Sequence, residues 1–152
     1  MNELPFVIPE AQIRTQAKID GVTHFSTGIA VMKDSKVLIV RRIANDFLGG
    51  NFELPGGGID EGESFQDGAI REMFEETGLQ ITTITKMFEG FDYSTNRKPK
   101  VRQLNFIVDT DSTDVVLSPE EHDMFLWVGK DEFANVPMSK NMRACLQIIF
   151  TA

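Results

Sequence analysis

The chain has 152 residues, of which 41% are hydrophobic and 25% are charged, and its formal net charge is -8 at pH 7. These values are typical of one globular domain and exclude a disordered or fibrous protein. The negative charge disfavours long nucleic acids as partners, because phosphate backbones are bound by patches of Lys and Arg. The single Cys145 cannot form an internal disulfide, and every apolar run is far shorter than the roughly 20 residues that span a bilayer. We therefore expect a cytoplasmic protein that binds no membrane.

The N-terminal part of the chain combines an extension with an expected hairpin. Residues 1–20 precede the first expected strand, and we expect them to pack on the domain or on the partner subunit of a homodimer. Residues 21–152 are expected to form a single domain. Two runs rich in β-branched residues, Gly28–Met32 and Val37–Ile43, flank the polar turn Lys33–Lys36. This pattern predicts two antiparallel strands.

A glycine-rich loop and a helix follow this hairpin. The short extended stretch Phe52–Leu54 ends at Pro55. Ser64 has the side chain of an N-cap, and Asp67 would place a negative charge in the first turn, where it complements the helix dipole. Gly78 stands where a glycine commonly ends a helix. A helix is therefore expected from about Ser64 to Thr77.

The second half of the chain alternates between strands and helices. Ile81–Phe88 and Val101–Val108 predict a second hairpin, and Met124–Val128 predicts a further strand. A short helix is expected at Lys130–Phe133 and a longer one at Lys140–Phe150. The apolar helix residues expected to pack on the sheet are Ile70, Met73 and Phe74, followed by Ala144, Cys145 and Ile148. The predicted fold class is α/β, with a sheet sandwiched between helices.

Three carboxylates share one face of the helix that starts at Ser64. At 100° per residue, Glu72, Glu75 and Glu76 fall within an arc of about 100°. Arg71 stands four residues before Glu75 and can reach it, but one guanidinium does not neutralise three carboxylates. A divalent cation would complete the charge balance.

The ligand types decide which cation is expected. Oxygen ligands suit Mg²⁺, with Mn²⁺ as a possible substitute, whereas zinc calls for His or Cys. His24 and His122 have no partner at ligand spacing in the sequence. Because Mg²⁺ takes part of its coordination from substrate phosphates, an Mg²⁺ site points to phosphate chemistry.

The glycine run Gly56–Gly58 lets the backbone approach a ligand closely. Glycine triplets are often only turns, so this signal is weak on its own. The loop lacks the Lys followed by Ser or Thr of a P-loop, and the residues after Asp60 do not fit a calcium-binding EF-hand.

Together, Gly57, Glu63 and the run Arg71–Leu79 resemble the Nudix box, Gly-x5-Glu-x7-Arg-Glu-U-x-Glu-Glu-x-Gly-U, where U is a bulky apolar residue. Every specified position is filled, with Met73 and Leu79 in the U positions. The box covers residues 57–79, and the expected elements around it are similar to the Nudix fold, a mixed β-sheet sandwiched between α-helices.

The resemblance implies an enzyme that cleaves phosphoanhydride bonds with Mg²⁺. By position, Glu72, Glu75 and Glu76 match the metal-binding carboxylates of the family, and the carbonyl of Gly56 matches a further metal ligand. Arg71 matches the residue that orients these glutamates, and Gly57 and Glu63 match supporting positions. Either Glu72 or Glu76 matches the group that takes a proton from the attacking water.

Residues outside the box are candidates for substrate contacts. Arg41 and Arg42 could bind phosphates, as could the basic group of Arg97, Lys98 and Lys100. Glu53 could accept a hydrogen bond from a ring N–H of a base. In each case a solvent-exposed surface residue is the alternative interpretation.

The substrate is expected to be a small nucleotide. The favoured reaction converts a nucleoside triphosphate to a monophosphate and pyrophosphate, as in MutT-type members of the family. Hydrolysis of ADP-ribose or a sugar nucleotide is the second hypothesis. A Nudix domain that senses a nucleotide without turnover is the alternative of another class, and isomerase chemistry would require an additional acid or base that the sequence does not identify.

Overall fold

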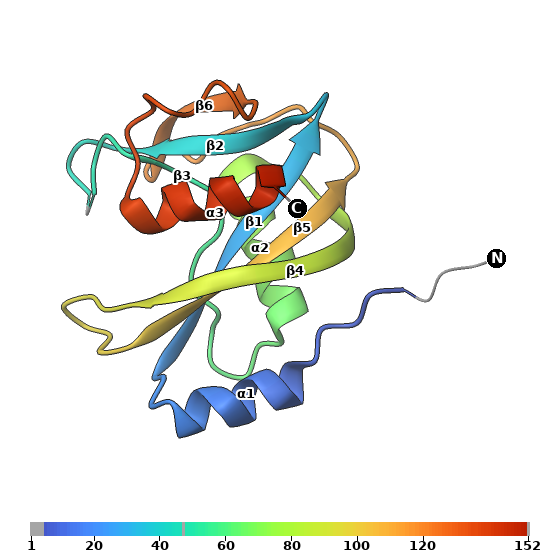
Figure 1. The fold of residues 1–152 in the computed structure, drawn as a ribbon, viewed down its shortest axis with the longest axis vertical. Helices are drawn as coiled ribbons and strands as arrows, with labels where there is room; N and C mark the ends of the chain where they lie inside the picture. Colours follow the sequence, from blue (N-terminus) through green and yellow to red (C-terminus); the bar gives the residue numbers. More distant parts are fainter. Residues whose placement is uncertain (1–4, 47, 152) are drawn as a thin grey trace.

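A mixed sheet lies between two helices in the computed structural model, which describes residues 5–46 and 48–151 (Figure 1). The helices are α1 (Glu10–Ile19), α2 (Phe65–Thr77) and α3 (Lys140–Thr151). The strands are β1 (His24–Lys33), β2 (Lys36–Arg42), β3 (Phe52–Glu53), β4 (Ile81–Tyr93), β5 (Val101–Thr110) and β6 (His122–Val128). The predicted α/β fold class is confirmed.

The strand order in the sheet is β3-β2-β1-β5-β4, and β6 also pairs with β2. The β1–β5 pair is parallel and all the other pairs are antiparallel. Only two residue pairs, Met32–Val37 and Lys33–Lys36, join β1 to β2 in this ladder. The two strands therefore diverge from their turn, and one edge of β1 is left to pair with another segment.

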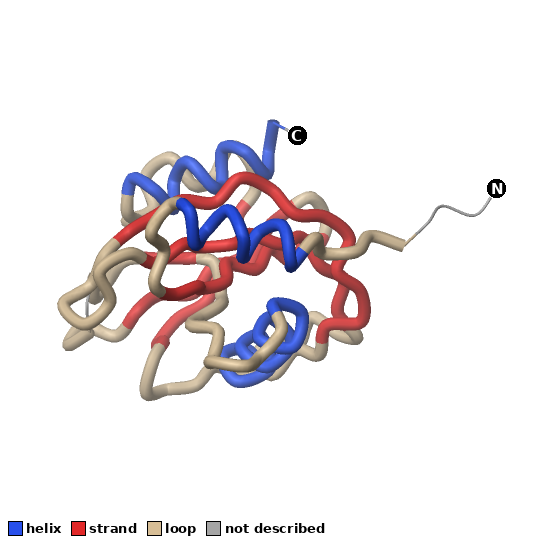
Figure 2. Tube along the Cα trace, turned by 90° about the horizontal axis from the view of Figure 1, so that it is seen from below, coloured by secondary structure: helices blue, strands red, loops and turns tan. Residues whose placement is uncertain are grey.

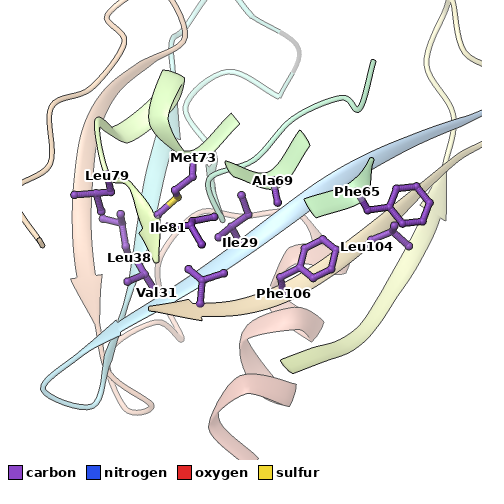
Figure 3. Close-up of a cluster of buried hydrophobic side chains, with 11 residues drawn as sticks. Ile29, Val31, Leu38, Phe65, Ala69, Met73, Leu79, Ile81, Leu104 and Phe106 are labelled. Atoms are coloured by element: carbon purple, nitrogen blue, oxygen red, sulfur yellow. The ribbon is translucent and has the colours of Figure 1, made fainter. Parts of the chain in front are cut away.

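The two faces of the sheet carry separate hydrophobic clusters because neighbouring strand residues point in opposite directions. Ile29 and Val31 of β1 lie in the cluster that contains Phe65, Ala69 and Met73 of α2 (Figure 3). Ala30, between them, belongs to the cluster on the side of α3. Figure 2 shows α2 and α3 on opposite sides of the strands. This arrangement fixes α2 against one face of β1.

Helix α2 begins and ends as the sequence predicts. The Ser64 hydroxyl accepts a hydrogen bond from the Asp67 N–H at 3.0 Å, and Gly78 ends the helix with a φ of 70°. Met73 is fully buried, but Phe74 is 56% exposed, so its predicted packing on the sheet is wrong. The buried stripe instead runs through Phe65 and Ala69, because the sheet meets α2 on that side.

Two other expectations about helices are also corrected. The segment Lys130–Phe133 contains turns rather than a helix, since Gly129 precedes it and four residues are too few for a stable helix without further support. Helix α3 is present, but Ala144 is exposed and Ile148 is only half-buried. The buried residues of α3 are Met142, Cys145, Leu146 and Ile149.

Helix α1 lies within the N-terminal extension and contacts the start of α2. A Glu10 carboxylate oxygen accepts a hydrogen bond from the Phe65 N–H at 2.6 Å, and the Arg14 guanidinium donates to the Glu63 carbonyl at 3.0 Å. The same guanidinium lies 4.3 Å from the centre of the Phe65 ring. Packing of the extension on a partner subunit stays a prediction. None of the helices in the described part of the chain combines the length and the apolar character needed to cross a membrane.

Candidate active site

The glycine-rich loop is held along the free edge of β1. The Thr27 N–H donates to the Gly57 carbonyl at 2.9 Å, and the Ile29 N–H donates to the Pro55 carbonyl at 2.8 Å. The Ile59 N–H donates to the Phe25 carbonyl at 3.0 Å. These bonds extend the sheet by one irregular segment and place the loop beside α2, which packs on the same strand.

Two glycines in this loop have no room for a side chain. A Cβ atom on Gly56 would overlap the Thr27 carbonyl, and the φ of Gly56, 150°, is one that other residues rarely adopt. A Cβ atom on Gly57 would overlap the carboxylate of Glu72. The loop therefore approaches both β1 and α2 at distances that only glycine allows.

Arg71 joins the loop to the acidic face of α2. Its guanidinium donates two hydrogen bonds to Glu63, at 2.8 and 2.9 Å, and one to Glu72 at 2.9 Å. It also donates to Glu75 at 3.2 Å and to the Gly58 carbonyl at 3.0 Å. The hydrogen bonds from Arg71 lower the pKa of Glu63 to about 2. Arg71 thus contacts several carboxylates at once, and its role in orienting metal ligands stays a prediction.

The three glutamates of α2 differ in their environments. Glu75 is 54% exposed, whereas Glu72 is 13% exposed and Glu76 is buried. Burial raises the pKa of Glu72 despite its bond to Arg71. Burial also raises the pKa of Glu76 to about 9, although one of its oxygens accepts a hydrogen bond from the Gly56 N–H at 2.7 Å. Two carboxylates are therefore placed where their negative charge lacks full compensation.

His122 lies beside Glu53 and Glu76, although its spacing from them in the sequence does not predict this contact. Its ring is 2% exposed, and its Nε2 atom lies 2.9 Å from a carboxylate oxygen of Glu53. Its Nδ1 atom lies 3.8 Å from the Oε2 atom of Glu76. His122 has no partner at ligand spacing in the sequence, but the pairing of β2 with β6, which sets Arg42 opposite His122, brings it next to Glu53 and Glu76. One signal was present in the sequence: Glu121 and His122 lie within three residues of the start of the predicted strand Met124–Val128.

The residues present fit a divalent cation. Ligand atoms of Glu76, Glu121 and His122 lie within 4.8 Å of one another, and they form a group of possible metal ligands within residues 5–46 and 48–151. Burial is the main cause of the raised pKa values of Glu72 and Glu76, so in the ionised form these carboxylates are poorly stabilised by solvent. A divalent cation would stabilise that form.

The predicted substrate residues Arg41, Arg42 and Glu53 have partners within the protein. Arg41 binds Asp123 at 2.7 Å. Arg42 donates to both carboxylate oxygens of Glu53, at 3.1 and 3.0 Å, and to Asp46 at 2.7 Å. Contacts from these three residues to a substrate stay predictions.

The structure separates the three basic residues that precede β5. The Lys98 ammonium lies at the glycine loop, 3.5 Å from the position of a Cβ atom on Gly58. The Lys100 ammonium instead donates to the Asp20 carbonyl at 2.7 Å, and Arg97 is exposed. The Lys98 ammonium thus lies beside Gly58, whose carbonyl accepts a hydrogen bond from Arg71 of α2.

A cavity of about 350 Å³ adjoins this site on the side of α3. Glu53 lines the cavity and also contacts His122, so the cavity and the carboxylates share a boundary. The other lining residues are aromatic, amide, hydroxyl and apolar side chains, with one guanidinium: Arg42, Leu48, Asn51, Phe52, Phe91, Tyr93, Ser94, Thr95, Gln103, Ser139, Asn141 and Met142. Aromatic faces and amide groups are suited to stack on a nucleobase and to bind its edge.

A comparison with protein families agrees with this geometry. The NUDIX domain model matches residues 22–147. The chain belongs to the Nudix family. The resemblance carried by the box is thereby confirmed, and the loop, Arg71 and the glutamates of α2 are the Nudix box of this chain.

Relatives in the Nudix family differ in the substrates that their names give. The asymmetrical bis(5'-nucleosyl)-tetraphosphatase of Mus musculus is 32% identical over 98 residues, which cover 61% of this chain and 65% of that protein. The ADP-ribose pyrophosphatase of Methanocaldococcus jannaschii is 38% identical over 81 residues, which cover 52% of this chain and 46% of that protein. The match thus spans less than two thirds of the length of each of these relatives.

A solved structure supports the Nudix fold independently. The MutT protein from Methanosarcina mazei Go1 superimposes with a TM-score of 0.72 at 24% identity, over 82% of this chain and 91% of that chain. At this level of identity the likeness establishes the fold alone.

Proposed function

We propose that this protein is a divalent-cation-dependent pyrophosphohydrolase that converts a nucleoside triphosphate to a monophosphate and pyrophosphate. One observation carries the proposal: Glu72 and Glu76 are shielded from solvent beside a glycine loop, with raised pKa values and incomplete charge compensation. Such a site favours a divalent cation together with the phosphates that cations of this kind bind.

The side chains of the Nudix box have separate roles in this proposal. The carboxylates of Glu72, Glu75 and Glu76 and the carbonyl of Gly56 would hold Mg²⁺, for which Mn²⁺ could substitute. When bound, the cation would polarise phosphate oxygens and offset the charge that develops in the transition state. Arg71 holds Glu72 and Glu75 in place through its hydrogen bonds at 2.9 and 3.2 Å.

The reaction is an in-line displacement at phosphorus. The oxygen of a water molecule bonds to phosphorus, and the bond from that phosphorus to the bridging oxygen breaks, which releases pyrophosphate. Glu72 and Glu76 are the candidates for accepting the proton of this water. Both carboxylates are largely shielded from solvent beside the glycine loop, where a water that attacks a bound phosphate would be within their reach. Proton transfer of this kind typically contributes about 10²- to 10⁴-fold to a rate.

The cavity beside Glu53 supports a nucleoside as the group that is recognised. Its volume of about 350 Å³ is near the lower end of the range for small-molecule sites, about 300–1,000 Å³, and suits one nucleoside better than two. Phe91 offers an aromatic face, and Asn141 offers an amide that can both donate and accept hydrogen bonds. Lys98, beside Gly58, is placed to contact a phosphate.

ADP-ribose is the second candidate substrate. Like a nucleoside triphosphate, ADP-ribose contains a nucleoside attached to a diphosphate. The relative from Methanocaldococcus jannaschii is named as an ADP-ribose pyrophosphatase. The name of the Mus musculus relative adds dinucleoside tetraphosphates to the compounds worth testing.

The test is a substrate panel of nucleoside triphosphates, ADP-ribose, sugar nucleotides and dinucleoside polyphosphates. Each compound is incubated with the purified protein and Mg²⁺, and the products are separated by chromatography. We expect pyrophosphate and a nucleoside monophosphate from a triphosphate, with no turnover in EDTA. Absence of turnover on every compound would contradict the proposal and favour a nucleotide-sensing domain.

Two variants test the roles of the glutamates. E72Q and E76Q each keep the size of the side chain and remove its charge, and E120Q changes an exposed neighbour of the site as a control. Turnover and Mg²⁺ affinity are measured separately. The proton acceptor is the residue whose replacement lowers kcat even at saturating Mg²⁺. Full activity in both E72Q and E76Q would contradict the assignment.

A further inference from the structure

His122 has a buried nitrogen atom that no group in the described part of the chain satisfies. The carboxylate of Glu53 can only accept hydrogen bonds when ionised, so the Nε2 atom of His122, 2.9 Å away, is the donor. In a neutral ring the Nδ1 atom then carries a bare lone pair. This atom is buried and has no hydrogen-bond partner within residues 5–46 and 48–151. A histidine with a purely structural role in a core normally has partners for both ring nitrogens.

The Nδ1 lone pair points toward a carboxylate rather than toward a donor. Oε2 of Glu76 is 3.8 Å away, too far for a direct hydrogen bond. The other oxygen of Glu76 already accepts the Gly56 N–H. A nitrogen lone pair and an ionised carboxylate oxygen that face each other in a buried space repel one another unless a proton or a metal ion lies between them. A shared proton would need a hydrogen bond, and 3.8 Å is too long for one, so the gap is better suited to a metal ion.

The distances suit a shared cation. Two ligand atoms at about 2.1 Å from one ion are separated by up to about 4.2 Å, so the 3.8 Å between His122 and Glu76 is within reach. Glu121 provides the third ligand atom, within 4.8 Å of the other two. Its side chain is exposed, so a change of rotamer can bring its carboxylate closer to the other two ligand atoms.

The opposite side of the ring has the support that a metal-binding histidine needs. Such a histidine usually donates its second N–H to a carboxylate, which fixes the ring and makes the ligand nitrogen more basic. Glu53 accepts that hydrogen bond here, and Arg42 holds Glu53 through two further hydrogen bonds. The series Arg42, Glu53 and His122 thus aims Nδ1 at Glu76.

We propose that Nδ1 of His122 is a metal ligand, and that His122, Glu76 and Glu121 together bind a divalent cation that accepts both nitrogen and oxygen ligands, such as Mn²⁺ or Zn²⁺. This ligand set favours these ions over Mg²⁺, because imidazole suits transition metals whereas Mg²⁺ prefers oxygen. The site deepens the proposed function, with which it shares Glu76. It adds a nitrogen ligand to an otherwise carboxylate site.

The test is pulsed electron paramagnetic resonance of Mn²⁺ bound to the 152-residue chain, without substrate. An imidazole ligand couples its ¹⁴N nucleus to the Mn²⁺ electrons, and a carboxylate does not. The chain contains only two histidines, His24 and His122, so two variants assign the signal. H24Q is the matched control, because His24 is exposed and its Nδ1 atom is 2.8 Å from the Thr23 hydroxyl. In H122Q the amide can still donate to Glu53, but the Nδ1 lone pair is lost.

We expect ¹⁴N coupling in the unmodified protein and in H24Q, and none in H122Q. We also expect the dissociation constant for Zn²⁺ to rise at least about tenfold in H122Q, since residues that only orient a ligand already contribute that much. The dissociation constant for Mg²⁺ should change less. Absence of ¹⁴N coupling in the unmodified protein, or its persistence in folded H122Q, would overturn the proposal.

A second variant keeps the test decisive where H122Q does not fold. E121Q changes an exposed residue and should weaken Zn²⁺ binding, whereas E120Q, its exposed neighbour, should not. Equal Zn²⁺ affinities in these two variants would remove Glu121 from the ligand set. The ¹⁴N signal needs no turnover, so the two proposals can fail separately. Hydrolysis without ¹⁴N coupling would overturn only the His122 ligand, and coupling without hydrolysis of any substrate would overturn only the proposed function.

Discussion

Gly57 lies against the carboxylate of Glu72, so closely that a Cβ atom on Gly57 would overlap it. The same carboxylate accepts a hydrogen bond from Arg71 at 2.9 Å. Position 57 therefore requires glycine, because the backbone of the loop passes directly beside the Glu72 side chain and leaves no room for a Cβ atom. This relationship gives a direct test of how accurately Glu72 must be placed.

The variant G57A should lower kcat by about 100-fold, because a displacement of about 1 Å in a catalytic group can cost that much. The methyl group would push Glu72 away from Arg71. G58A is the control, since a Cβ atom there meets only the Lys98 ammonium at 3.5 Å, an ordinary contact. Steady-state kinetics with circular dichroism would show whether the loss reflects the site or the fold. Equal kcat values for the two variants would contradict the argument.

The sequence predicts those parts of the molecule that depend on neighbours along the chain. Helix α2 could be placed from Ser64 and Gly78, and the box residues share one loop and one helix. Helix α1 was missed, although its sequence, EAQIRTQAKI, is rich in residues with high helix propensity. That element could have been found from the sequence.

Features that depend on strand pairing could not be predicted in this way. His122 and Glu76 are distant in the sequence and meet only because β6 pairs with β2. The exposure of Phe74 and Ala144 likewise depends on where each helix touches the sheet, which helical periodicity does not determine. The same limit applies to the cavity beside Glu53, whose lining comes from separate strands and from α3.

Stability at low pH should depend on the pair of Arg71 and Glu63. The pKa of Glu63 is lowered from 4.5 to about 2 by its hydrogen bonds to Arg71. The folded state therefore binds fewer protons on Glu63, and the stabilisation is present above pH 4.5 and is lost as the pH falls toward 2. In E63Q the unfolding free energy should fall less steeply over this range. Urea titrations from pH 2 to 6 would measure the slopes, with E61Q as an exposed control. Equal slopes would contradict the pairing.

Glu76 should have the opposite effect on the metal-free protein. Its pKa is raised from 4.5 to about 9 by burial, so the folded state holds the proton more tightly than the unfolded state. This tighter proton binding stabilises the folded state relative to a carboxyl with the ordinary pKa of 4.5. The stabilisation is fully present below pH 4.5 and is lost as the pH rises toward 9. In EDTA, E76Q should show a flatter decline in unfolding free energy over this range. A divalent cation should restore stability at high pH in the unmodified protein and much less in E76Q; an equal gain would exclude Glu76 as a ligand.

Lys98 should contribute to substrate binding. Its ammonium lies beside Gly58 in the loop next to Arg71 and the box glutamates, where a substrate phosphate is expected. K98A should raise KM by about tenfold, as for the loss of one charged hydrogen bond of about 1.5 kcal/mol, and should change kcat little. R97A is the matched control, because Arg97 is adjacent and exposed. The contact would be disproved by a KM for K98A equal to that of R97A.

The last prediction concerns the attachment of α1 to the box helix. The Glu10 carboxylate accepts a hydrogen bond from the Phe65 N–H, at 2.6 Å, and thereby satisfies one of the donors that the start of α2 leaves free. E10A should reduce the unfolding free energy by about 1 kcal/mol, as for the loss of an N-terminal cap. E10Q keeps an acceptor and loses the charge that favours a helix N-terminus, so its loss should be smaller. Hydrogen exchange at the Phe65 amide would locate the effect. We expect faster exchange at Phe65 in E10A than in E10Q, because only the alanine leaves that N–H without its acceptor. Identical exchange in both variants would show that α1 does not stabilise the start of α2.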